Sequence, residues 1–158
     1  MLPYKLLRLI ETHSDTLAAR LVDKVRESES ARSFIQVPPE ELKDRAAEIY
    51  QHLYDWLLVK TDADLRRRYG HIGARRYNQR VPLADVVWVM MLAKQNLWEF
   101  LNFEVVPERP AEVYGELDLL QLIGSFFDRA IHYAVEGYEQ ARPEKRCDRI
   151  QSAASQAA

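Results

Sequence analysis

Apolar residues recur every three to four positions along almost the whole chain, and no stretch alternates convincingly between apolar and polar residues. This spacing is typical of amphipathic α-helices, whereas strict alternation would indicate β-strands. The chain is therefore predicted to be all-α, a bundle of about five to six helices with a long helix at its C-terminal end.

Two helices are predicted in the first part of the chain. The first spans about 3–26, and Asp15 can restart it after a kink. The second spans about 39–59 and follows a pair of prolines, which suit the first turn of a helix because their missing N–H needs no partner there. We expect residues 28–37 between them to form a polar connector.

The third predicted helix starts at a Thr61 or Asp62 cap and runs toward Asn78. Its inward stripe is spaced four, three and four residues apart and consists of Leu65, Tyr69, Ile72 and Arg76. An arginine thus falls on the buried side of the helix. A desolvated guanidinium there needs a carboxylate partner or a ligand.

The fourth predicted helix, about 82–103, is apolar on two faces. One face carries Leu83, Val86, Met90, Ala93, Leu97 and Phe100, and the other carries Ala84, Trp88, Met91 and Trp98. A helix that is apolar on two sides lies centrally or at an interface.

The last predicted helix, about 111–141, places apolar residues four and three positions apart over about four heptads, a pattern that indicates a bundle seam or a coiled coil. The stripe consists of Val113, Leu117, Leu120, Gly124, Phe127, Ile131, Ala134, Tyr138 and Ala141. We therefore expect a dimer or helix-seam interface at Trp88, Met91, Trp98, Leu117, Leu120, Gly124, Phe127 and Ile131. Residues 1–142 are predicted to form one domain, and 143–158 a flexible tail.

Composition narrows the class of protein further. With 47% hydrophobic and 29% charged residues and a net charge of −2, the chain of 158 residues suits a folded domain and not a generally basic nucleic-acid binder. The single cysteine, Cys147, excludes an internal disulfide and fits a reducing compartment, so we expect a cytoplasmic protein. No apolar run reaches the roughly 18 to 20 residues of a membrane span.

Residues that could support catalysis are few. The four histidines form no metal-ligand pattern, and the nucleophile and phosphate-loop motifs are missing. The carboxylate pairs Glu40 with Glu41 and Asp62 with Asp64 sit at helix starts, where capping explains them. The sequence thus predicts neither an enzyme nor a metal site.

A cluster of arginines interleaved with aromatic residues leaves three interpretations open. Its members are Arg66, Arg67, Arg68, Arg75, Arg76 and Arg80. They can form a solvated helix face with one or two arginines in buried ion pairs, a site for an anionic ligand or acidic partner, or a nucleic-acid surface, which we consider the least favoured. If a ligand binds, Tyr69, His71, Arg76 and Trp88 are its predicted contacts.

Gly70 and Gly73 lie inside the third predicted helix, where each costs about 1 kcal/mol relative to alanine. Close approach of another helix would compensate for this cost, as would room for a ligand or a local break. The tryptophans Trp56, Trp88 and Trp98, with Met90 and Met91, form either ordinary core or the lining of an apolar pocket.

The chain resembles the N-terminal sensory domain of the RsbT co-antagonist proteins of the RsbRD type, the stressosome sensors with a non-haem globin-like fold. The resemblance covers about residues 5–140 and rests on the opening amphipathic helix, on IYQHLYDWL, on YGHIGARRYNQRVPLADVV and on the apolar helix that follows. It implies a dimeric helical sensory module that signals through its C-terminal helix to a regulatory protein, of the STAS-domain or switch-kinase type. Such sensors usually continue into a STAS domain, so this chain is expected to be a stand-alone module or a fragment.

The same block is similar to the part of globin-coupled oxygen sensors where an Ile-Gly pair precedes the haem-ligating histidine. Here Ile72 and Gly73 are followed at that place by Arg76, which stays protonated and has no lone pair for iron. His71 lies on another face of the helix. We therefore expect no cofactor, with a haem or small-ligand sensor as the alternative.

Overall fold

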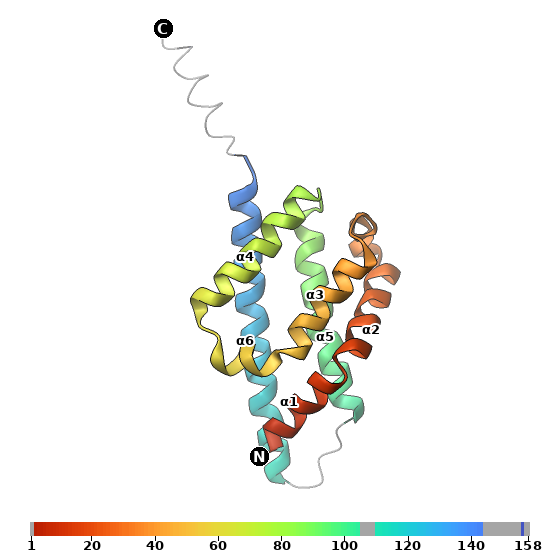
Figure 1. The fold of residues 1–158 in the computed structure, drawn as a ribbon, viewed down its shortest axis with the longest axis vertical. Coiled ribbons are helices and arrows are strands. Elements are labelled where there is room, and N and C mark those ends of the chain that lie inside the picture. The colour runs from red at the N-terminus through yellow and green to blue at the C-terminus, as the bar shows by residue number, and fades with distance from the viewer. Residues whose placement is uncertain (1, 105–109, 144–155, 157–158) are drawn as a thin grey trace.

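The computed structural model describes residues 2–104, 110–143 and 156, and in these ranges the regular structure is entirely helical (Figure 1). The elements are α1 (Leu2–Thr12), α2 (Ser14–Glu27), the 3₁₀ segment η1 (Glu29–Gln36), α3 (Pro39–Gln51), the π-helical segment η2 (Asp55–Val59), α4 (Asp62–Asn78), α5 (Leu83–Glu104) and α6 (Pro110–Ala141). The predicted all-α fold with a long last helix is confirmed.

The long α6 forms the axis of the molecule. It packs against α4, α5 and α1, while α2 packs against α3 and α5 on the other side (Figure 1). The inward residues of all these helices form a single hydrophobic core, which includes Ile10, Leu17, Tyr50, Leu97 and Phe126.

The predicted first helix is broken into α1 and α2 at His13, two residues before the predicted restart. The predicted polar connector is the 3₁₀ segment η1, which buries Ala31 and Phe34. The prediction of a polar connector did not specify its conformation, and the structure shows that two apolar side chains among polar ones dock this short helical segment on the core.

The start of α4 has the predicted cap. The Thr61 hydroxyl accepts a hydrogen bond from the Asp64 N–H at 3.2 Å, and the Asp64 carboxylate accepts one from the Thr61 N–H at 2.9 Å. This reciprocal capping box satisfies two backbone donors that the first turn leaves without partners. It fixes where α4 begins and hence which of its residues face inward.

Glycines allow the backbones of α4 and α6 to come into direct contact where the two helices cross. A Cβ at Gly73 would overlap the Ala134 carbonyl of α6, and a Cβ at Gly137 would overlap the Gly70 carbonyl of α4. At Gly70 itself an added Cβ would lie 3.9 Å from the Tyr133 carbonyl oxygen, an ordinary contact. The close helix approach expected from the two glycines of α4 is thus found, and Gly73 is the one that needs it directly.

The buried face of α6 coincides only in part with the predicted stripe, of which Phe127, Ala134 and Tyr138 are buried. Leu117 is 50% exposed, Ile131 is half-buried and Gly124 faces open space, whereas the core is formed by Leu119, Ile123, Phe126, Phe127, Ala130, Ala134 and Tyr138. Leu120 is partly buried, and Phe127 lies inside the core, a position that suits a helix seam and not a dimer surface. Two apolar stripes run side by side on α6, so the heptad count did not distinguish them. Val113 lies outside the residues whose side chains are described.

The two apolar faces of α5 differ in burial. Val86, Ala93, Leu97 and Phe100 are buried, as predicted for the first face. On the second face, Trp88 is 37% exposed, Met91 40% and Trp98 40%. Within residues 2–104 and 110–143, no element fully covers this face.

Candidate functional site

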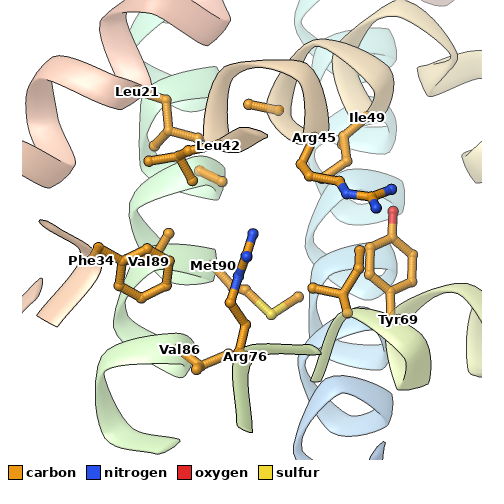
Figure 2. A pocket seen from close by; sticks show the side chains of 13 residues that line it. Leu21, Phe34, Leu42, Arg45, Ile49, Tyr69, Arg76, Val86, Val89 and Met90 are labelled. Carbon is orange, nitrogen blue, oxygen red and sulfur yellow. The ribbon is translucent and has the colours of Figure 1, made fainter. Parts of the chain in front are cut away.

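A cavity of 60 Å³ lies where α2, α3, α4, α5 and η1 meet (Figure 2). Its walls are almost entirely apolar. They are formed by Leu21, Phe34, Leu42, Ala46, Ile49, Ile72, Val86, Val89, Met90 and Ala93, together with the three polar side chains Arg45, Tyr69 and Arg76. Any polar side-chain contact with a ligand in the cavity would come from these three residues.

Arg76 enters the interior from α4, as its place on the inward stripe predicted. It is 3% exposed, and its Nη1 donates to Glu41 Oε1 at 3.0 Å and to Gln79 Oε1 at 2.6 Å. Its guanidinium also lies 5.7 Å from the centre of the Phe34 ring. Burial lowers the pKa of Arg76, and the hydrogen bond and charge of Glu41 oppose that shift. The buried charge therefore has the carboxylate partner that its position required.

Glu41 joins two arginines of α4 to the start of α3. Besides Arg76, it accepts hydrogen bonds from Arg75 Nε at 2.5 Å and Nη2 at 3.1 Å, and from Gln79 Nε2 at 3.2 Å. The hydrogen bond from Arg75, with that from Arg76 and their charges, lowers the pKa of Glu41 from 4.5 to about 2. Glu41 is thus ionised at any physiological pH.

Tyr69 is a buried donor without a partner. It is 1% exposed, and its ring packs against Trp56 and Phe126, with centroids 5.4 and 5.7 Å away. Its hydroxyl makes no hydrogen bond with the residues that the structure describes, and burial raises the pKa of Tyr69, so the group keeps its proton. In Figure 2 this hydroxyl points toward the guanidinium of Arg45.

An open cleft of 640 Å³ lies outside the cavity, between α3 and α4. It is lined by Arg45, Arg68, His71, Ile72, Ala74, Arg75, Asn78 and Gln79. Arg45 and Ile72 line both spaces. A polar, arginine-rich cleft therefore meets an apolar cavity at these two residues.

The structure separates the four predicted ligand contacts. It brings Tyr69 and Arg76 together in the cavity wall, and it leaves His71 exposed in the outer cleft. Trp88 lines neither space, because it lies on the exposed face of α5, where its Nε1 donates to Ser28 Oγ at 3.0 Å. Of the predicted Trp and Met lining only Met90 reaches the cavity, and Trp56 is core.

Arg45 and Glu41 are the site residues that the sequence interpretation missed. Both lie on α3, and Arg45 falls among Leu42, Ala46 and Ile49, which all line the cavity. This spacing of three, four and seven residues places an arginine at the edge of the inward stripe. The same test that singled out Arg76 could therefore have found Arg45.

The arginine cluster of α4 is largely paired with carboxylates. Arg66 binds Glu136 at 2.7 Å and Arg67 lies 3.7 Å from Asp64, while Arg68 contacts Glu48, and Arg75 and Arg76 share Glu41. Exposed ion pairs of this kind contribute little stability, but they reduce the charge available to a polyanion. This pairing favours the interpretation as a solvated face with a buried ion pair over a nucleic-acid surface.

Two further observations limit the chemistry of the described residues. They contain no cluster of three or more histidine, cysteine or acidic side chains that could hold a metal ion. Among the helices that the structure describes, none is both long and apolar enough to cross a membrane.

The family model of the RsbT co-antagonist protein rsbRD N-terminal domain matches residues 15–152 of the chain. This match covers most of the sequence and all the residues around the cavity. A search of curated proteins found no match, and neither did a search of solved structures.

Proposed function

Because this chain belongs to the RsbRD N-terminal domain family, a family of stressosome-related sensory and regulatory domains, we propose that it is a haem-free, globin-like sensory module that acts in the cytoplasm as a homodimer. Residues 1–142 would form this module. Its output would pass through contacts with another protein, of the STAS-domain or switch-kinase type.

The observation that supports the dimer is the exposed face of α5. Trp88, Met91 and Trp98 follow each other at intervals of three and seven residues, so they lie on one side of the helix. Leu117 and Leu122 of the neighbouring α6 are exposed as well, at 50% and 39%. Large apolar side chains exposed along one face of a helix, as on α5, are typical of a protein interface, and a two-fold axis would cover the same face on both copies.

Size-exclusion chromatography with light scattering tests this proposal. The wild-type chain is expected to elute at twice its mass of 18.5 kDa. The double substitution Met91→Glu and Trp98→Glu should shift it to a monomer, because it places charges in the proposed apolar contact. Val59→Glu is the matched control, since Val59 is 58% exposed on η2, a segment that packs against α6 rather than α5, and should leave the dimer intact.

Circular dichroism would verify that the double variant keeps its helices. A wild-type chain that stays monomeric at high concentration would contradict the dimer, and so would a folded double variant that remains dimeric.

A further inference from the structure

The junction of the apolar cavity and the outer cleft has an excess of positive charge. Four arginines, Arg45, Arg68, Arg75 and Arg76, form ion pairs with only two carboxylates there, those of Glu41 and Glu48. Arg45 holds the weakest of these pairs, with its Nη1 3.7 Å from Glu48 Oε2, an oxygen that Arg68 also contacts. Arg45 is therefore the guanidinium with most capacity for another anion.

The Tyr69 hydroxyl adds a second donor at the same place. A buried hydroxyl without a partner destabilises the fold, so such groups are rare unless something else satisfies them. Figure 2 shows this hydroxyl and the Arg45 guanidinium pointing toward each other across one edge of the cavity. The Tyr69 oxygen could also accept a hydrogen bond from an arginine, but it makes none with Arg45, and its O–H proton still needs an acceptor. One anionic acceptor between the two groups would accept from both.

The apolar space beyond these donors is small. A cavity of about 150 Å³ binds benzene, and about 10 to 15 Å³ is enough for one water molecule. The 60 Å³ found here lies between these limits, and its walls offer a water few polar partners. A short alkyl group of about three to four carbons suits this space better than a ring or a long chain.

We propose that this junction is a binding site for a short-chain carboxylate, whose carboxylate group lies between Arg45 and the Tyr69 hydroxyl and whose alkyl chain fills the cavity. The inference rests on the proposed sensory function for its biological role. Arg76 lines the cavity but keeps Glu41 as its partner, so it positions α4 against α3 and does not bind the anion itself.

The test is an NMR titration of the folded, isotopically labelled chain with sodium butyrate. Backbone amide signals near the cavity are expected to shift with saturation. Acetate lacks the chain that fills the cavity and should bind at least about tenfold more weakly, and butylamine, which carries the opposite charge, should not bind. Equal shifts with sodium chloride would show a nonspecific salt effect and would overturn the proposal.

Two variants distinguish the loss of a hydrogen-bond donor from a loss of fold stability. Tyr69→Phe removes only the unpaired hydroxyl, so it should weaken butyrate binding about tenfold while leaving the melting temperature of the free protein unchanged or higher. Arg45→Gln should weaken binding to a similar extent. The matched control is Arg66→Gln, which removes an arginine of α4 away from the cavity and should bind butyrate like the wild type.

The result of the butyrate titration does not depend on whether the chain forms a dimer. Unchanged binding by both Tyr69→Phe and Arg45→Gln would overturn the carboxylate site, as would an absence of saturable shifts with butyrate. In either case the light-scattering result on α5 would still decide the proposed sensory dimer.

Discussion

Arg76 brings a full positive charge into the interior of the molecule. Removing a guanidinium from water costs several kcal/mol, and only hydrogen-bonded partners of opposite charge offset that cost. Glu41 supplies the charge and Gln79 a further acceptor, so the arginine is held at the boundary of α3 and α4 by a small polar network. Removing Glu41 leaves the buried charge of Arg76 with only the neutral acceptor of Gln79.

Glu41→Gln is expected to destabilise the protein by roughly 2 kcal/mol at pH 7, because a charged acceptor of two arginines is lost. The folded-state pKa of Glu41 is about 2, below its ordinary value of 4.5, so its ionised form stabilises the fold above pH 4.5. That contribution is lost as the pH falls from 4.5 toward 2. Urea unfolding at pH 7 and pH 3 measures both effects.

The control for this prediction is Glu40→Gln, in the same first turn of α3 but exposed. It should change stability by less than about 1 kcal/mol and keep the acid dependence of the wild type. If Glu41→Gln lost stability between pH 7 and pH 3 as steeply as the wild type, the assigned pKa would be wrong.

At the scale of residues, the sequence predicted the burial of Arg76 and its need for a carboxylate, but it did not identify Glu41. The two residues lie 35 positions apart on different helices. Which carboxylate meets the guanidinium depends on how α3 and α4 cross, and helical spacing within one segment contains no information about that. That Arg45 and Tyr69 line the same cavity could not be predicted, for the same reason.

At the scale of elements, the helix boundaries were predictable where local chemistry fixes them. Thr61 and Asp64 form a capping box that sequence spacing alone indicates, and α4 begins there. The two apolar stripes of α6 are a different case. Leu117 and Leu119 belong to neighbouring stripes of similar hydrophobicity, and only the positions of α4 and α5 decide which one is buried.

The crossing of α4 and α6 gives a prediction at this scale. Gly73→Ala should destabilise the protein by about 3 kcal/mol, because its Cβ overlaps the Ala134 carbonyl and the helices must move apart. Gly70→Ala, three residues away on the same helix, should be neutral or stabilising by up to about 1 kcal/mol, since its Cβ meets nothing closer than 3.9 Å. Chemical denaturation of both variants measures the difference, and equal effects would contradict the close crossing.

At the scale of the whole molecule, the family and the all-α class were predictable from the sequence, because a pattern distributed over most of the chain specifies them. The cavity was not predictable. It exists where four helices and η1 fail to fill the space between them, and its volume depends on the placement of all five elements at once.

The size of that cavity leads to a prediction about haem. Pockets that enclose drug-sized molecules measure about 300 to 1,000 Å³, several times the 60 Å³ found here, and Arg76 offers iron no lone pair. Haemin added to the purified protein should therefore give no saturable Soret band, measured by absorption against a haem-binding globin as positive control. A sharp Soret band that saturates at equimolar haemin would contradict this expectation.

The glycine contact between α4 and α6 has a mechanical consequence. Where backbone lies directly on backbone, no side chain can change its rotamer to absorb a displacement, so the two helices are stiffly coupled at Gly73 and Gly137. Any tilt of α4 that accompanies filling of the cavity is then imposed on α6. The glycine contact would therefore transmit a displacement of α4 at the cavity wall to the last turns of α6, near Ala141.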